Sequence, residues 1–322
     1  MKPPYEITRK ILELYGQITE ALGICRSLLL VKPEARLRKQ NRIRTIHSSL
    51  AIEGNTLNIE HVAAIIDNIH VVGPQKDILE VQNAIKAYDR LKDFNPLKVN
   101  DFLKAHSVLM HGLVDDPGKF RKSHVGIMKG KQVSHIAPRH SMVPGLMNDL
   151  FKYLKEDNDL ELIKSCVFHY EMEFIHPFED GNGRMGRYWQ TRLLMKVNPI
   201  FEFVPVEKVI KDNQKEYYQA LELSDKAGNS TRFIEFMLEV INKSLRETID
   251  ATRAPGPDYT SRTEYALSVL NDWFDRKEYM KICKGISTAT ASRDIRQMID
   301  DGKIESAGSG RMTKYKKKPA AE

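Results

Sequence analysis

The sequence predicts an all-α fold with a small β-hairpin, joined to a C-terminal winged-helix domain. Apolar residues recur at helical spacing over most of the chain, one short stretch alternates around a glycine, and a Pro-Gly segment precedes a compact basic end. The 322 residues, 41% hydrophobic and 29% charged, suffice for one large domain and one small one. We expect a helical N-terminal region at 1–95, a helical core at 96–250 and a winged helix at 257–318.

Most of the first 250 residues show apolar positions three and four residues apart, which is the period of an amphipathic helix. The predicted helices span residues 7–22, 62–69, 78–91, 102–113, 146–154, 162–174, 187–195 and 234–249. Gly73-Pro74, Pro117-Gly118 and Asn198-Pro199 interrupt the pattern between them. One segment, 125–135, differs: two short extended arms flank Lys129-Gly130-Lys131, which predicts a β-hairpin.

A domain boundary is predicted at 252–257, where Arg-Ala-Pro-Gly-Pro ends the helical pattern. Helices are expected at 264–274, near 279–283 and at 288–299, and a Gly-Ser-Gly turn follows between Ile304 and Tyr315. The buried side of the third helix is expected to comprise Ala289, Ile295, Met298 and Ile299. In a winged helix this third helix is the one offered to the major groove of DNA.

The charge pattern leaves the partner of this C-terminal unit open. Basic residues cluster at its end, at Arg311, Lys314, Lys316, Lys317 and Lys318, which indicates either nucleic-acid contact or a solvated tail. The third helix offers Arg293, Arg296 and Gln297 as base readers, whereas Asp294, Asp300 and Asp301 oppose DNA. DNA binding and a protein-contacting or packing module therefore both stay open.

Three cysteines lie far apart at Cys25, Cys166 and Cys283, which argues against a disulfide framework or a zinc cluster and favours a reducing, cytoplasmic location. No run reaches the roughly 18 apolar residues of a membrane span, so we expect no membrane partner. Apolar helical surface leaves a homodimer open.

The densest run of unusual residues is His176-Pro177-Phe178-Glu179-Asp180-Gly181-Asn182-Gly183-Arg184-Met185-Gly186-Arg187. Glycines at the start of a helix let the backbone approach an anion, and the helix N-terminus points free N–H groups at it. Arg184 and Arg187 are three residues apart, so both can project toward phosphates. Asp180 can hold Mg²⁺ and His176 can accept a proton from a hydroxyl. The run therefore predicts a site for phosphoryl or nucleotidyl transfer.

This run fits the pattern His-Pro-Phe-x-Asp/Glu-Gly-Asn-Gly-Arg-x-x-Arg at every defined position, and from Pro3 to about Leu245 the chain resembles the Fic family. The resemblance implies a protein adenylyltransferase that moves AMP from ATP, with Mg²⁺, onto a hydroxyl of a target protein or of itself. The implied roles are general base for His176, Mg²⁺ ligand for Asp180, anion hole for Gly181, Asn182 and Gly183, triphosphate contacts for Arg184 and Arg187, and packing anchor for Phe178.

Two further segments carry implied roles. The hairpin at 125–135 resembles the flap of the family, which pairs with the target backbone as an added strand, and Gln132, Val133, Ser134 and His135 would lie nearest the nucleotide. Glu216-Tyr217-Tyr218-Gln219-Ala220-Leu221 resembles a segment whose second tyrosine, Tyr218, lies by the base, and Asp225 stands where relatives often have Asn. Helix packing is the alternative for Tyr217 and Tyr218.

Ser49-Leu50-Ala51-Ile52-Glu53-Gly54-Asn55 forms a second motif. Ser49 and Glu53 share a helical face, and Gly54 is a natural helix stop. An anion at a helix C-terminus is unfavourable without a cationic partner. The run resembles the Fic inhibitory motif Ser/Thr-x-x-x-Glu-Gly/Asn, which implies that Glu53 pairs with Arg187 and holds that arginine away from the γ-phosphate of ATP.

Other functions stay open. The chain could be a transcriptional regulator in which the winged helix is the output and the Fic part is a sensor. Fic proteins also transfer UMP, phosphate or phosphocholine, or remove AMP, and in removal Glu53 would position a water. The intact Arg187 favours AMP transfer from ATP.

Overall fold

The structure is a computed structural model that describes residues 2–27, 35–123, 126–129, 132–253, 259–283, 286–308 and 313–318. Side chains are described in these ranges except at 126–129, 132–136, 253 and 261. The chain divides into two compact units, residues 1–249 and 250–322. The N-terminal region and the helical core expected from the sequence share one hydrophobic core in the first unit.

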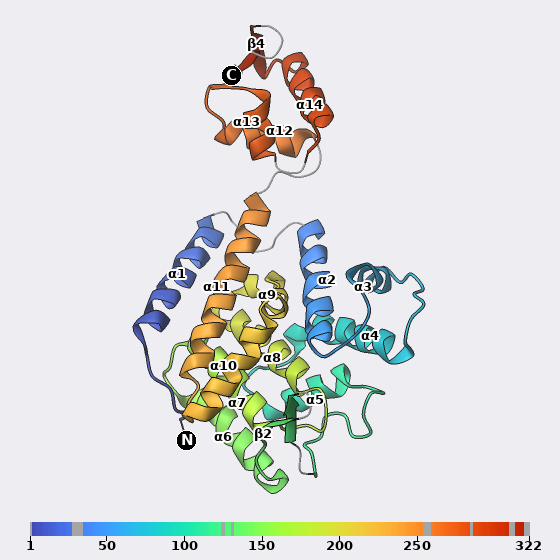
Figure 1. Cartoon of the computed structure of the whole chain (residues 1–322), viewed down its shortest axis with the longest axis vertical. Coiled ribbons are helices and arrows are strands. Elements are labelled where there is room, and N and C mark those ends of the chain that lie inside the picture. Colours follow the sequence, from blue (N-terminus) through green and yellow to red (C-terminus); the bar gives the residue numbers. More distant parts are fainter. Residues whose placement is uncertain are drawn as a thin grey trace. The chain divides into compact units, whose positions relative to one another are not determined.

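The first unit is almost entirely helical, as predicted (Figure 1). Its α-helices are α1 Arg9–Ser27, α2 Ala35–Ile52, α3 Ile59–Ile66, α4 Gln75–Asp89, α5 Val99–Leu109, α6 Val143–Glu156, α7 Glu161–Ile175, α8 Asn182–Val197, α9 Val206–Asp212, α10 Gln214–Ala227 and α11 Thr231–Arg253. Short 3-10 turns follow at Leu91–Asp93, His140–Met142 and Pro199–Phe203. The predicted helices are present with shifted ends. Of α2 only the end near Glu53 was expected, α10 was expected only as the helix-packing alternative for Tyr217 and Tyr218, and α9 was not expected.

Most of helix α2 was not predicted because much of its buried side is polar. Asn41, Thr45, Ser48 and Ser49 are all buried, so the helix shows no clean apolar stripe. Asn41 donates from Nδ2 to the Phe203 carbonyl at 2.9 Å. Ser49 Oγ, which belongs to the predicted inhibitory motif, accepts from Arg187 Nε at 3.2 Å, so both side chains have partners outside α2.

Helices α7 and α8 pack against each other in the middle of this unit, and the loop 176–181 joins them (Figure 1). Gly186 permits this close approach, because a Cβ there would lie 2.7 Å from Glu173 Oε1 and 2.9 Å from His169 Cδ2. A residue with a side chain at 186 would therefore force the two helices apart.

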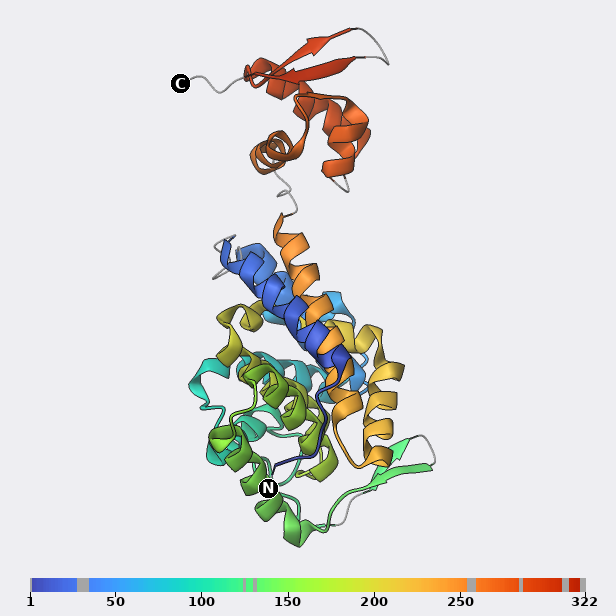
Figure 2. The same cartoon turned by 90° about the vertical axis from the view of Figure 1, so that its left-hand side faces the viewer.

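The predicted hairpin is present. Strands β1 Gly126–Lys129 and β2 Gln132–Ile136 pair antiparallel, with Ile127 opposite His135 and a bulge between Ile127 and Met128. Val125, Gly130 and Lys131 lie outside the described residues. The hairpin stands out from the helices, and β2 runs beside α10 (Figure 2).

The second unit has its own hydrophobic core, which includes Tyr279, Ile295 and Met298. It contains α12 Tyr259–Val269, β3 Trp273–Phe274, α13 Arg276–Ile282, α14 Thr288–Asp300, β4 Ile304–Ala307 and β5 Lys314–Lys317. The three strands form an antiparallel sheet in the order β3-β5-β4. The first helix begins and ends five residues earlier than expected, because 273–274 forms a strand. The winged-helix assignment stays a prediction, and Arg311 lies outside the described residues.

The buried side of α14 differs from the predicted one. Ala289 is exposed and Ile299 is 37% exposed, whereas Ala291 and Asp294 are buried beside Ile295 and Met298. Asp294 is buried because its two oxygens accept from Arg262 Nε and Nη2, both at 2.7 Å, and Oδ2 also accepts from the Tyr279 hydroxyl at 2.9 Å. The expectation that Asp294 opposes DNA from the surface is therefore wrong.

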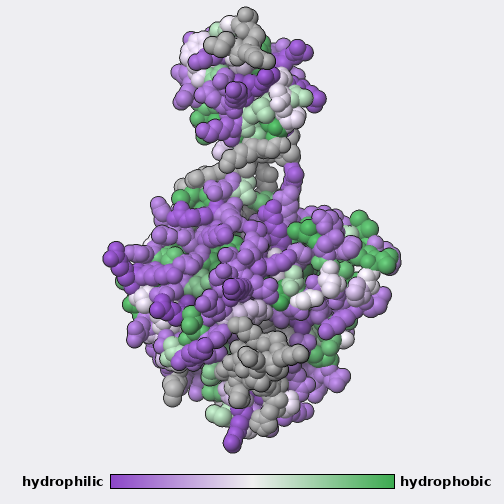
Figure 3. Space-filling view, viewed as in Figure 1, coloured by the Kyte–Doolittle hydropathy of each residue, from purple (hydrophilic) through white to green (hydrophobic). Residues whose placement is uncertain are grey.

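Exposed apolar residues gather around the connection from α3 to α4, where Ile69 and Val72 are 60% and 86% exposed (Figure 3). Most of the remaining surface in that view is polar. Among the described residues, every helix is too short or too polar to cross a membrane.

Candidate active site

The loop 176–181 begins with a backbone conformation that non-glycine residues seldom adopt. His176 caps α7 with φ 49° and ψ 62°, in the left-handed region. Its Nδ1 lies 3.4 Å from the Glu173 carbonyl, an acceptor that only a protonated Nδ1 satisfies. This contact favours the tautomer whose other ring nitrogen, Nε2, accepts a proton.

The side chain of Asn182 holds the loop 176–181 closed through two hydrogen bonds with the Phe178 backbone. Asn182 Oδ1 accepts from the Phe178 backbone N–H, and Nδ2 donates to the Phe178 carbonyl, both at 2.9 Å. Gly181 has φ 83°, and a Cβ there would lie 2.6 Å from Met110 Sδ. Glycine is therefore required at 181 by both its backbone and its surroundings.

Phe178 anchors the loop from below. Its ring is buried and stacks on His106, with centroids 3.6 Å apart. His106 Nδ1 accepts from the Gly118 N–H at 2.8 Å, so its Nε2 donates to the Asp180 carbonyl at 3.0 Å. Burial lowers the pKa of His106 to about 4 and keeps this ring neutral. His106 was not singled out in the sequence, and it fixes the loop through its bond to the Asp180 carbonyl.

The anion hole was predicted at the start of α8, which begins at Asn182. The Met185 N–H makes the helical bond to the Gly181 carbonyl at 2.9 Å. The N–H groups before it, at Asn182, Gly183 and Arg184, belong to the first turn, where an α-helix has no acceptor of its own. These donors and the positive end of the helix dipole favour an anion at Gly183.

A carboxylate from α2 lies at this place. Glu53, just after the end of α2, has Oε1 2.7 Å from Arg187 Nη2, and a Cβ on Gly183 would lie 2.3 Å from the same oxygen. Arg187 also donates from Nε to Ser49 Oγ at 3.2 Å and from Nη2 to the Ser49 carbonyl at 2.9 Å. Burial is the largest influence on the pKa of Arg187 and lowers it, but Glu53, Tyr217 and Glu173 together raise that pKa above its usual value.

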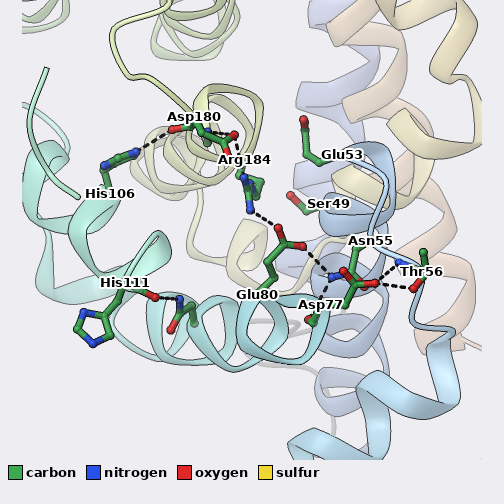
Figure 4. Close-up of polar contacts among 12 residues, drawn as sticks. Ser49, Glu53, Asn55, Thr56, Asp77, Glu80, His106, His111, Asp180 and Arg184 are labelled. Atoms are coloured by element: carbon green, nitrogen blue, oxygen red, sulfur yellow. Dashed lines mark hydrogen bonds and ion pairs between the residues drawn. The ribbon is translucent and has the colours of Figure 1, made fainter. Parts of the chain in front are cut away.

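Arg184 turns to different partners, so the two arginines do not project together as expected. Arg184 Nη1 lies 2.9 Å from Glu80 Oε1 on α4, and Nη2 lies 3.1 Å from Asp180 Oδ1. Glu80 Oε2 in turn accepts from Asn55 Nδ2 at 2.8 Å. Figure 4 shows this chain of contacts from Asp180 through Arg184 and Glu80 to Asn55, two residues after Glu53. The sequence analysis missed Glu80 and Asn55 as members of the site.

The carboxylate of Asp180 is half exposed, at 51% of its side chain, and its Oδ1 accepts from the Gly181 N–H at 2.6 Å. Within the described part of the chain, no group of three or more His, Cys, Asp or Glu residues could hold a metal ion. Mg²⁺ does not need such a cage, because it commonly binds one or two carboxylates, phosphate oxygens and water. Asp180 thus fits a Mg²⁺ ion that arrives with a nucleotide.

A second acid, Glu173, lies near Arg187. Its Oε1 is buried without a hydrogen bond, and burial raises its pKa to about 8, with Arg187 lowering it and Glu53 raising it. His169 Nε2 is 3.8 Å away and accepts from the Tyr217 hydroxyl at 3.0 Å. The raised pKa favours the protonated form of Glu173, whereas Glu53 contacts Arg187 directly at 2.7 Å.

The remaining predicted residues lie farther along the site. Gln132, Val133, Ser134 and His135 form β2, and the structure describes their backbone only. Tyr218 on α10 is 39% exposed, whereas Tyr217 is buried. Asp225 Oδ1, also on α10, accepts from the Tyr170 hydroxyl at 2.9 Å. Packing thus accounts for Tyr217, and Tyr218 is the tyrosine that a ligand can reach.

Comparisons with known proteins identify the family of the chain. The sequence profile of the Fic/DOC family matches residues 96–194, which include the loop and the start of α8. The protein adenylyltransferase Fic of Nematostella vectensis is 29% identical over 76% of this chain and 56% of its own length. The protein adenylyltransferase of Caenorhabditis elegans named fic-1 is 25% identical over 68% of this chain and 43% of its own length. The chain spans about half the length of these curated relatives.

Solved structures of Fic proteins are also similar to this chain. The crystal structure of a Fic family protein from Desulfovibrio desulfuricans G20 is 37% identical, with a TM-score of 0.77, and the match covers the whole of both chains. A structure of Fic-1 from C. elegans is 20% identical with a TM-score of 0.60, covers 76% of this chain and 72% of the other, and shares the fold. The chain therefore belongs to the Fic family.

Proposed function

We propose that the chain is a protein adenylyltransferase that moves AMP from ATP to a hydroxyl side chain of a target protein or of itself, and that Glu53 inhibits it. The observation that carries the proposal is the helix N-terminus at Gly183 with Arg187 beside it and His176 at the head of the same loop. The curated relatives named protein adenylyltransferase support the same reaction.

In the proposed reaction the acceptor hydroxyl oxygen forms a bond to the α-phosphorus of ATP, and the bond from that phosphorus to pyrophosphate breaks with its electron pair on pyrophosphate. His176 takes the hydroxyl proton at Nε2. The N–H groups at the start of α8 and Arg187, once Glu53 has released it, hold the phosphates in line, while Arg184 orients Asp180 at 3.1 Å. Mg²⁺ at Asp180 would neutralise charge on the phosphate oxygens.

Label transfer distinguishes AMP transfer from the other Fic reactions. Full-length Glu53→Gly protein is incubated with Mg²⁺ and either α-³²P-ATP or γ-³²P-ATP, with unlabelled UTP as competitor. We expect protein-bound label from α-³²P-ATP only, because AMP retains the α-phosphorus and loses the γ-phosphorus. Label from γ-³²P-ATP would indicate phosphate transfer, and loss of label in the presence of UTP would favour UMP transfer.

The hairpin is the proposed docking place of the target. The edge of β2 can accept an extended strand of another protein through main-chain hydrogen bonds. Its place beside α10, which carries Tyr218, supports a path from the docked strand to the nucleotide.

We also propose that the second unit contacts DNA, on one specific observation. With Asp294 turned inward, the exposed face of α14 carries Ser292, Arg293 and Arg296. Arg276 Nη1 on α13 donates to Ser292 Oγ at 3.1 Å and extends this basic face. Among the described residues, neither Arg293 nor Arg296 forms a salt bridge, so both charges can meet phosphates.

The DNA proposal is tested with the full chain by fluorescence anisotropy over a salt series. We expect the Arg293→Ala/Arg296→Ala variant to bind a duplex about tenfold more weakly, with a slope of log affinity against log salt shallower by about two. Arg9→Ala/Arg232→Ala removes the same charge from the first unit and is the matched control. Equal binding by both variants would contradict the proposal and favour a protein-contacting module.

A further inference from the structure

The side chain of Arg121 contacts two parts of the site, the start of the loop 176–181 and the base of the β1–β2 hairpin. It lies between α5 and β1 and is 3% exposed. Its guanidinium donates to the carbonyls of His176 (Nε, 2.7 Å), Ser123 (Nη1, 2.8 Å), Pro138 (Nη2, 2.5 Å) and Ile175 (Nη2, 3.4 Å), and its backbone N–H donates to the Pro177 carbonyl at 2.9 Å.

These acceptors fall into two groups. Three of them, at 175–177, are the end of α7 and the start of the motif loop, where an α-helix carries carbonyls without helical partners and the negative end of its dipole. The other two, at Ser123 and Pro138, lie just before β1 and just after β2. One side chain therefore holds the base of the hairpin and the backbone of His176.

The charge of Arg121 is compensated by these carbonyl dipoles. Among the salt bridges of the described residues, none involves Arg121, and burial lowers the pKa of its guanidinium. A guanidinium remains protonated in a protein. Its planar fork reaches several acceptors in fixed directions, which the single ammonium of a lysine does not do.

We propose that Arg121 is a positioning residue that fixes His176 and the base of the β1–β2 hairpin as one unit, so that a target strand docked on β2 meets the general base in register. The inference rests on the proposed function for the role of the hairpin. One side chain, Arg121, would support both the hairpin on which the target docks and the position of the general base. Loss of this support should slow transfer without weakening ATP binding, because Arg121 touches neither the start of α8 nor its arginines.

The test compares Arg121→Met and Arg121→Lys in the Glu53→Gly background. Arg139→Met is the matched control, since Arg139 is exposed and follows Pro138 directly. Single-turnover label transfer and ATP affinity by calorimetry are measured on each folded variant. We expect transfer to fall about a hundredfold in Arg121→Met and about tenfold in Arg121→Lys, as for a misplacement of about 1 Å or less. We expect ATP affinity, and both quantities in Arg139→Met, to stay within about twofold.

Amide hydrogen exchange gives a readout that needs no activity. In Arg121→Lys, exchange should accelerate together at 126–136 and at 176–180, and in Arg139→Met at neither. Faster exchange in only one of the two segments would overturn the proposal that Arg121 supports both. Near-parental transfer in Arg121→Met, or a loss of ATP affinity that parallels the loss of rate, would also overturn it. If the Glu53→Gly parent itself labels no protein, the proposed function fails, whereas the exchange result still decides the role of Arg121.

Discussion

Glu53→Gly should raise AMP transfer by about a hundredfold over the wild type in a label-transfer assay with α-³²P-ATP, which is the gain expected when a substrate misplaced by about 1 Å is allowed into line. In the wild type the Glu53 carboxylate lies at Gly183 and holds Arg187 at 2.7 Å. In the proposed reaction the γ-phosphate of ATP would use the same arginine and the same helix N-terminus. Removing the carboxylate leaves both Arg187 and the N-terminus of α8 free for the phosphate.

Three further variants test whether the gain in transfer comes from the release of Arg187 or from a structural change at the end of α2. Glu53→Gln keeps the size of the side chain but removes its charge, so it should also raise transfer. Ser49→Ala removes only the 3.2 Å bond to Arg187 Nε and should raise it less. Arg187→Ala in the Glu53→Gly background should lose the gain, because no arginine remains to be released. Equal labelling of wild type and Glu53→Gly would refute inhibition by Glu53.

His176→Ala in the Glu53→Gly background should lower transfer by about 10²–10⁴-fold, the usual contribution of a general base. The left-handed backbone at 176 complicates this test, because alanine is strained there and could shift the loop. His176→Asn avoids the problem, since asparagine tolerates this conformation and lacks a base of suitable pKa.

Both His176 variants should retain ATP affinity, because the anion hole and Arg187 are untouched. Equal loss in the alanine and asparagine variants assigns the effect to the missing imidazole. If the asparagine variant transfers AMP at the parental rate, His176 is not the base. A rise in the release of label from pre-labelled wild-type protein, with no transfer by any variant, would instead favour AMP removal with a water positioned by Glu53.

The sequence alone located the loop, the helix that follows it and the hairpin, because each has a strong local signal. Glycine and proline mark the ends of 176–183, and the glycine between two extended arms marks the hairpin. The end of α2 was also predicted, because glycine is a natural helix stop, and Gly54 does adopt φ 89° directly after Glu53. These features depend on neighbours in sequence, so a short window suffices to find them.

Residues that act across long sequence separations were missed. Glu80 lies in line with Ala84 and Ala87 on the buried side of α4, and a charged residue in an apolar stripe was the available signal. Asp294 shows the same signal beside Ala291 and Met298 on α14. Arg121 gives no such signal, because it stands in a connecting segment and its acceptors are main-chain carbonyls. Only the fold brings those carbonyls together.

The bond pair between Asn182 and Phe178 bears on how a nucleotide would be received. Because the loop is already closed by its own amide side chain, folding has ordered the N–H groups that a phosphate would meet. Preorganised sites lose less conformational entropy when a ligand arrives. Because Glu53 holds Arg187, correct placement of the γ-phosphate should then depend on the release of that arginine, and a titration with ATP should show little reshaping of the backbone.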